Sequence, residues 1–178
     1  MFKKNTGMQN LYYDKWINGY HFVVLGPTYP MSKLSKHYDT VLSETQLKWL
    51  AKQLAQSPHN KPTFVFLHEP IPNTVAGSNG GYLINGDKLR NILNQYSSVL
   101  FFSGHTHYTL KNNPGAVYHD HFTMFNTSSV RNPITSNHKS IGDSEGLYVE
   151  VDDHKVTVRG RDFTNRMWIN NFTIRINS

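Results

Sequence analysis

The sequence predicts an α/β fold built on a mixed β-sheet with flanking helices. Short apolar runs alternate with segments of helical periodicity along much of the chain, and strands of alternating polar and apolar residues follow them. This order of elements is typical of a mixed sheet with helices on at least one face. With 178 residues, of which 38% are hydrophobic, the chain can bury a substantial core, and we expect one domain.

The first part of the chain is predicted to alternate strands with helices. Residues 20–25, which are apolar except for His21, read as a strand closed by Gly-Pro. A helix is expected to begin after Ser43, its predicted cap, with Gln46 reaching back to complete a capping box. Residues 64–67 and 99–102 are continuous apolar runs, typical of strands covered on both faces. A second helix lies between them, with Asn85 as its predicted cap.

The later part of the chain has an antiparallel pattern. Residues 122–127 read as a strand. Leu147, Val149 and Val151 alternate with polar residues, and the pattern resumes at residues 156–158 after an Asp-Asp-His turn. This alternation predicts a hairpin with one buried face.

Composition excludes several classes of site and partner. The chain has no cysteine, so a metal must be held by His, Asp, Glu or Asn. The formal charge is +6, but Lys and Arg are scattered, which favours a solvated basic surface over a nucleic-acid partner. No apolar run approaches the ~20 residues that span a bilayer, so no membrane partner is expected. The two lysines near the start precede no apolar stretch, so we expect no signal peptide and leave the localisation unknown.

Three histidines follow the predicted buried strands. His68 comes after the first strand, and His105 and His107 come after the next, with Gly104 allowing a sharp turn before them. In open α/β sheets ligands bind beyond the carboxyl ends of strands, so these side chains can converge on one metal site. Imidazole suits Zn, Fe, Mn or Ni. With ten histidines in the chain, coincidence is the competing explanation.

The order of His68 and the Gly104-His105-Thr106-His107 motif resembles the closing motifs of the calcineurin-like metallophosphoesterases. The resemblance extends over residues ~18–163 and includes the helix before His68 and the segment 125–131. It implies the C-terminal half of a four-layer αββα sandwich. It also implies hydrolysis of phosphomonoesters or phosphodiesters by two metals, Mn, Fe or Zn, with His68 and His105 as ligands of one metal and His107 of the other. None of the three would be the general acid, so no catalytic residue is assigned in this chain.

The resemblance stops short of the family's upstream motifs. Asp-x-His, Gly-Asp-x-x-Asp and Gly-Asn-His do not occur in residues 1–67. Three near matches come later and are interpreted as turn or chance occurrences: Asp152-Asp153-His154, Gly86-Asp87 leading to Arg90, and Ser136-Asn137-His138. Histidines without a bridging carboxylate can hold at most one weakly bound metal, because adjacent cations repel.

We therefore expect residues 1–178 to be a single incomplete domain, inactive alone, whose natural partner is the missing N-terminal half and whose substrate is a phosphate ester. We expect the uncovered sheet to self-associate. The alternative is a non-catalytic metal-binding or interaction module derived from the same family. Glu69 is interpreted as a loop residue, or alternatively as an outer-shell acceptor behind His68. His119-Asp120-His121 is interpreted as a polar surface loop.

Overall fold

The computed structural model describes residues 2–28, 40–80 and 82–176. A six-stranded sheet has the order β1-β2-β3-β4-β6-β5, and a three-stranded sheet has the order β7-β8-β9. The strands are β1 (Tyr13–Ile17), β2 (Tyr20–Val24), β3 (Thr63–Phe66), β4 (Val99–Ser103), β5 (Val117–His119), β6 (Thr123–Asn126), β7 (Glu145–Val151), β8 (Lys155–Asp162) and β9 (Met167–Arg175). The helices are α1 (Phe2–Thr6), α2 (Glu44–Gln56) and α3 (Gly86–Leu93), with short 3-10 helices η2 (Ser78–Gly80) and η3 (Pro114–Ala116).

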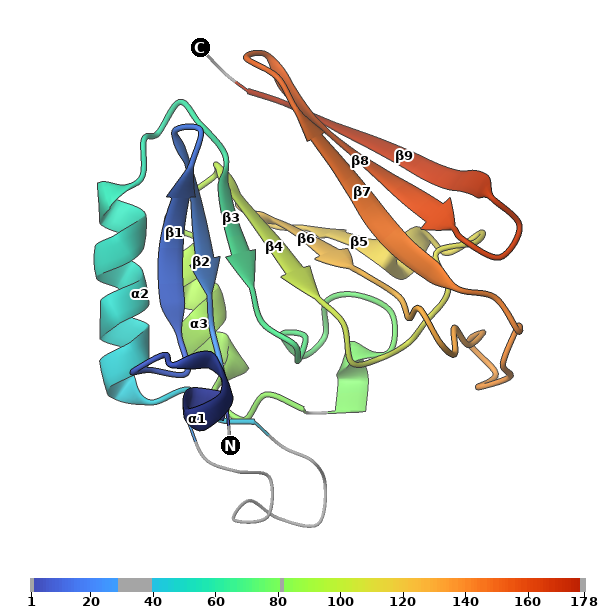
Figure 1. Ribbon diagram of the computed structural model, residues 1–178, viewed down its shortest axis with the longest axis horizontal. Helices are drawn as coiled ribbons and strands as arrows, with labels where there is room; N and C mark the ends of the chain where they lie inside the picture. The colour runs from blue at the N-terminus through green and yellow to red at the C-terminus, as the bar shows by residue number, and fades with distance from the viewer. Residues whose placement is uncertain (1, 29–39, 81, 177–178) are drawn as a thin grey trace.

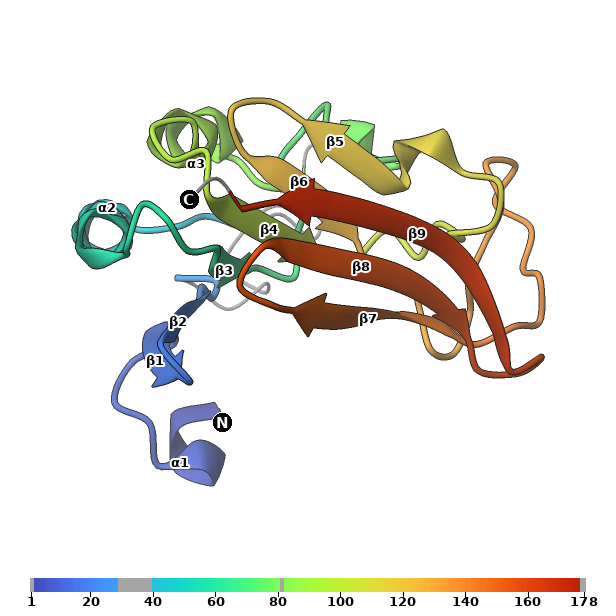
Figure 2. The ribbon, with the colours of Figure 1, turned by 90° about the horizontal axis from the view of Figure 1, so that it is seen from above.

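The larger sheet is mixed, and helices flank it on one side. Strands β2, β3, β4 and β6 run parallel, while the edge strands β1 and β5 are antiparallel to their neighbours. Helices α2 and α3 cover one face of this sheet, and β7–β9 lie over the other face (Figures 1 and 2). The predicted α/β fold class with a mixed sheet is thus confirmed, with the hairpin and β9 forming a separate antiparallel layer.

Two apolar clusters hold the layers together. On the helix side, Leu47, Leu50 and Leu54 of α2 are buried in one cluster with Val65 and Phe101 of the sheet. On the other side, Phe64, Leu100, Phe102 and Phe125 are buried with Val156 and Val158 of β8. The continuous apolar runs of β3 and β4 therefore supply side chains to both faces, as strands covered on two sides must.

Two predicted capping contacts are wrong in detail. Ser43 caps α2 by accepting the backbone N–H of Gln46 at 3.1 Å, but the Gln46 side chain does not reach back to the cap. It is buried and bonds both backbone groups of Gly26, joining α2 to the end of β2. Asn85 precedes α3 but makes no side-chain cap bond. Its amide instead bonds the backbone N–H and carbonyl of Leu42. In both cases a tertiary partner replaces the local one.

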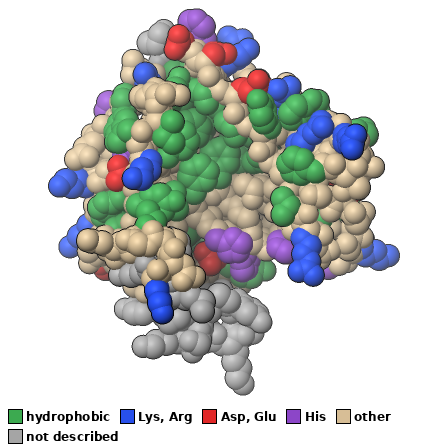
Figure 3. Space-filling model, viewed as in Figure 1, with side chains coloured by type: hydrophobic (Ala, Val, Ile, Leu, Met, Phe, Trp, Pro, Cys, Tyr) green, Lys and Arg blue, Asp and Glu red, His purple; other side chains and the backbone are tan. Residues whose placement is uncertain are grey.

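An apolar cavity of about 580 Å³ remains between the two sheets. Its lining includes Phe22, Phe66, Leu147 and Val151, and Figure 3 shows the hydrophobic surface with histidines gathered below it. The sheet face that we expected to be uncovered is thus partly covered by β7–β9 of the same chain. None of the helices in the described part of the chain has the length and apolarity needed to cross a membrane.

Candidate functional site

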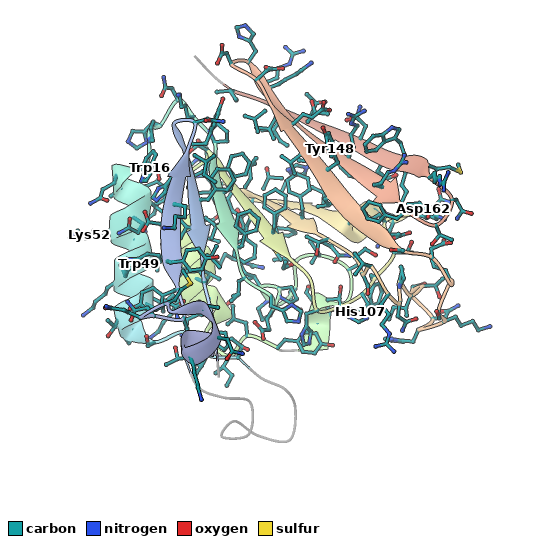
Figure 4. The ribbon with its side chains drawn as sticks, viewed as in Figure 1. Trp16, Trp49, Lys52, His107, Tyr148 and Asp162 are labelled. Atoms are coloured by element: carbon teal, nitrogen blue, oxygen red, sulfur yellow. The ribbon has the colours of Figure 1, made fainter. Side chains whose placement is uncertain are left out.

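The parallel strands β3 and β4 bring the predicted histidines to one edge of the sheet. His68 follows β3, and His105 and His107 follow β4, which pairs with β3 in parallel register. The rings of His68 and His105 meet edge to face, with centroids 5.2 Å apart. His107 lines the same cavity and lies below the ends of the strands, where Figure 4 labels it. The structure thus gathers all three at one site.

The backbone that carries these histidines has an uncommon conformation. His105 has a φ of 66° and His107 a φ of 58°, a left-handed region that costs energy for residues other than glycine. The N–H of Thr106 bonds the carbonyl of Gly104 at 2.7 Å, which closes a tight turn around His105. Such conformations cluster at functional sites, where the surrounding structure holds them in place.

Gly104 links the two histidine segments. Its N–H bonds the carbonyl of His68 at 3.0 Å. A Cβ at this position would lie 3.3 Å from the Thr127 hydroxyl oxygen, which is a tight contact, and 3.6 Å from Nδ1 of His68, which is an ordinary one. Glycine therefore relieves crowding against Thr127 beside the histidines.

The protonation of His105 is biased toward the neutral form. Burial lowers its pKa, and the nearby His68 and His107 lower it further, while the charge of Glu69 acts in the opposite direction. A neutral imidazole has a free lone pair, as a metal ligand requires. The ring of Tyr82 lies 4.2 Å from that of His105 and limits its motion.

Glu69 is buried, which the interpretation as a loop residue did not anticipate. It is only 5% exposed. One carboxylate oxygen, Oε1, accepts the hydroxyl of Thr40 at 2.6 Å. The other, Oε2, is buried without a hydrogen-bond partner among the described residues.

Glu145 is a second buried carboxylate, which we did not predict as part of the site. Oε1 accepts the hydroxyl of Thr109 at 2.7 Å, while Oε2 accepts the hydroxyl of Ser128 at 2.7 Å and the N–H of Leu110 at 2.8 Å. This network joins the loop after His107 to the loop after β6 and to β7. The signal was available, because Glu145 continues the alternation of Leu147, Val149 and Val151 toward the same buried face.

None of the other candidate sequences is among the residues that line this cavity. Asp152 accepts the backbone N–H groups of His154 and Lys155 in the β7–β8 turn, as expected of turn chemistry. Gly86 and Asp87 begin α3. His119, Asp120 and His121 are exposed, and Nδ1 of His121 bonds the carbonyl of Asn94. His138 is exposed and packs edge to face with Tyr108.

Within the described chain, the three histidines do not form a metal site together with a carboxylate. The carboxylate that lines the cavity with them, Glu145, is already engaged by three donors. Among residues 2–28, 40–80 and 82–176, no three His, Asp or Glu side chains are close enough together to hold a metal ion. A two-metal centre, which needs bridging anionic oxygens, does not fit these residues alone.

Solved structures share the fold. A dimetal phosphatase from Danio rerio superposes with a TM-score of 0.64 at 16% identity, over 93% of this chain and 60% of that one. GAP50, described as the anchor in the inner membrane complex of Plasmodium, gives a TM-score of 0.64 at 16% identity, over 96% of this chain and 56% of that one. The chain thus spans little more than half the length of these neighbours.

Sequence comparison identifies the family. No curated protein sequence matches the chain significantly. The model of the calcineurin-like phosphoesterases matches residues 2–109, a segment that contains His68, His105 and His107 and makes up more than half of the 178 residues. The chain therefore belongs to the calcineurin-like phosphoesterase family.

Proposed function

We propose that this chain carries the histidine part of a metal-dependent phosphomonoesterase or phosphodiesterase site. His68, His105 and His107 are the metal ligands. The observation that carries the proposal is the gathering of these side chains at one strand edge, on a strained backbone, within the segment that matches the family. A bound Mn, Fe or Zn ion would polarise a phosphate ester and lower the pKa of a water molecule.

The chain alone is expected to bind one metal weakly and to hydrolyse nothing. A second cation needs carboxylate ligands, and the described residues provide no such group beside His68, His105 and His107. We propose that further polypeptide, corresponding to the N-terminal half of the family domain, supplies these carboxylates and packs on the apolar cavity between the sheets. Without it, the same apolar surface favours self-association.

Metal binding tests the ligand assignment. Isothermal titration calorimetry with Zn²⁺ is expected to give about one site per wild-type chain, lost in His68→Ala and His105→Ala. His154→Ala, which removes an exposed histidine from the β7–β8 turn, is the matched control and should bind as the wild type does. Unchanged binding by both site variants would overturn the assignment.

Hydrolysis tests the expected inactivity. The chain is incubated with p-nitrophenyl phosphate and with its bis ester in the presence of Mn²⁺, next to His107→Ala. We expect both proteins to give the background rate. If the wild type turns over substrate and His107→Ala does not, a carboxylate within this chain completes the site.

A non-catalytic binding module is the second candidate, and the lack of a complete metal-binding group among the described residues favours it. Such a module would bind metal and stay inactive even in a longer polypeptide that contains the upstream motifs. Turnover by that longer polypeptide, abolished by His107→Ala, would exclude the module.

A further inference from the structure

We infer that the outer face of β7–β9, which is turned away from the larger sheet, is a binding surface for single-stranded nucleic acid. Figure 2 looks onto this face. The opposite face of the same strands packs on Phe64 and Phe102, so the inference is independent of the proposed metal site. The cations involved are scattered along the sequence, and only the folded sheet brings them together.

The outer face is strongly basic. Alternation along β8 turns its valines toward the core, so Lys155, Arg159 and Arg161 lie on the opposite side. Arg175 of β9 is the cross-strand partner of Lys155 and adds a fourth cation. Among the described residues of these strands, the only carboxylate on this face is Glu150, which pairs with Arg159, since the other two are buried. Four cations against one carboxylate complement a chain of phosphates.

Exposed aromatic rings interleave with these cations. Tyr148 of β7, labelled in Figure 4, and Trp168 of β9 meet edge to face with centroids 5.6 Å apart. The guanidinium of Arg159 lies over both rings, 4.1 Å from the centroid of Trp168 and 5.5 Å from that of Tyr148. Arg161 lies 4.9 Å from the Trp168 centroid. Tyr148 and Trp168 stay 49% and 47% exposed, so these rings and guanidinium groups offer planes on which unpaired bases stack.

The β8–β9 turn adds a third ring to the outer face and holds it in place. The ring of Phe163 lies over Gly146, where a Cβ would come within 3.1 Å of it, and Gly146 is the cross-strand partner of Arg161. Asp162 accepts both the backbone N–H and the side-chain amide of Asn165, which fixes the turn. Because the rings are held before a ligand arrives, little conformational entropy is lost on binding.

Single-stranded nucleic acid uses both kinds of group on this face. Its phosphates pair with the cations, and its unpaired bases expose their π-faces to the rings. A duplex keeps its bases stacked inside, and an acidic peptide offers carboxylates alone, so neither needs the aromatic residues. The competing explanation is structural, because exposed cations on an edge strand such as β9 also prevent pairing with other chains.

Fluorescence anisotropy tests the inference with the whole chain and labelled oligothymidylate or oligouridylate of about 15 nucleotides. EDTA is present, so that no metal at the histidines takes part. Trp168→Ala should raise the dissociation constant about 5–150-fold, whereas Trp168→Phe keeps a stacking ring and should retain most of the affinity. Arg161→Gln should reduce the slope of log affinity against log salt concentration by about 0.7. Glu150→Gln removes the opposing charge and should tighten binding.

The controls make each outcome decisive. Lys52→Gln removes an exposed cation from α2, on the other side of the molecule, and should bind as the wild type does. If Trp168→Ala does not fold, as judged by circular dichroism, Arg161→Gln and Glu150→Gln decide the result. The inference is overturned if the wild type does not bind, or if folded Trp168→Ala and Arg161→Gln bind as it does. Equal binding of a duplex, or a preference for polyglutamate or phosphatidylserine vesicles, would overturn it as well. Since metal is absent throughout, every one of these outcomes leaves the proposed function standing.

Discussion

The two buried carboxylates near the three histidines, Glu69 and Glu145, differ in their hydrogen bonding. Glu145 accepts hydrogen bonds from Thr109, Ser128 and Leu110, so both of its oxygens are satisfied. Glu69 accepts one hydrogen bond, from Thr40, and keeps one buried oxygen without a partner in the described chain. A fully satisfied carboxylate serves the fold, because its partners are all part of the protein. A half-satisfied one retains capacity for a ligand.

The largest expected effect is on stability, and it separates the two carboxylates. Glu145→Ala leaves three buried donors unpaired and should lower the free energy of unfolding by about 3–5 kcal/mol. Glu69→Ala leaves one donor unpaired and also removes an incompletely paired buried charge, so about 1 kcal/mol is expected. Urea unfolding of the metal-free proteins, followed by circular dichroism, measures both. Equal losses in the two variants would contradict the view that Glu145 stabilises the fold more than Glu69 does.

A third buried carboxylate, Asp162, extends the comparison to pH. Burial alone would raise its pKa, but hydrogen bonds from Asn165 and Lys111 outweigh burial and hold the pKa well below its usual range. Lys111 bridges Asp143 and Asp162 at 2.6 Å each, and its own pKa is raised, first by the hydrogen bond to Asp143. Asp162 thus resembles Glu145, with all its partners within the protein.

The sign of the pH effect follows from the lowered pKa. An aspartate that is more acidic in the folded state contributes stability above its unfolded pKa of about 3.9, and this stability is lost as the pH falls further. Because Lys111 is 36% exposed and partly screened by water, we expect a contribution on the order of 1–2 kcal/mol. Urea unfolding between pH 6 and 3 should show this loss in the wild type and a weaker one in Asp162→Asn. Parallel pH curves would exclude Asp162 as a source of the acid sensitivity.

The sequence was enough to predict which strands end at the three histidines. It was not enough to predict the backbone conformation or the side-chain contacts around them. Apolar runs placed β3 and β4, and so placed His68, His105 and His107 at one edge, because parallel strands end together. The left-handed backbone at His105 and His107 was not predicted, because only a few per cent of non-glycine residues adopt it and nothing in the sequence singles out these two positions. The partners of Gln46 and Asn85 also escaped prediction. Their local capping geometry was plausible, and only the packing of β2 and of residue 42 supplies the better partners.

The burial of Glu145 could have been predicted from the sequence, whereas that of Glu69 could not. The alternation of β7 pointed Glu145 inward, so its burial could have been read from the sequence. Glu69 stands between His68 and Pro70, where no periodicity exists to read. Its hydrogen-bond donor, Thr40, is distant in the chain and reaches it only in the folded protein.

The smallest expected effect is the change in stability when His107 is replaced. This residue precedes the loop whose Thr109 and Leu110 donate hydrogen bonds to Glu145. The left-handed φ of 58° at His107 costs a non-glycine residue about 1–2 kcal/mol, part of which a glycine recovers. After the entropy cost of glycine in the unfolded state, His107→Gly should raise the free energy of unfolding by about 0.5 kcal/mol. His107→Ala should not raise it, because alanine keeps the strain. Both variants lose the imidazole, so the difference between them in urea unfolding isolates the backbone.

His59→Gly is the matched control, because His59 is exposed and is not among the residues with a positive φ. It should lose about 0.5–1 kcal/mol from the flexibility of glycine alone. If the free energy of unfolding falls by the same amount in His107→Gly as in His59→Gly, the backbone at His107 is not strained in solution. If His107→Gly instead raises the free energy of unfolding while Zn²⁺ binding weakens, the histidine destabilises the fold but supports binding. That outcome is expected of a residue retained for a ligand, and it would distinguish the strained backbone at His107 from the fully hydrogen-bonded network of Glu145.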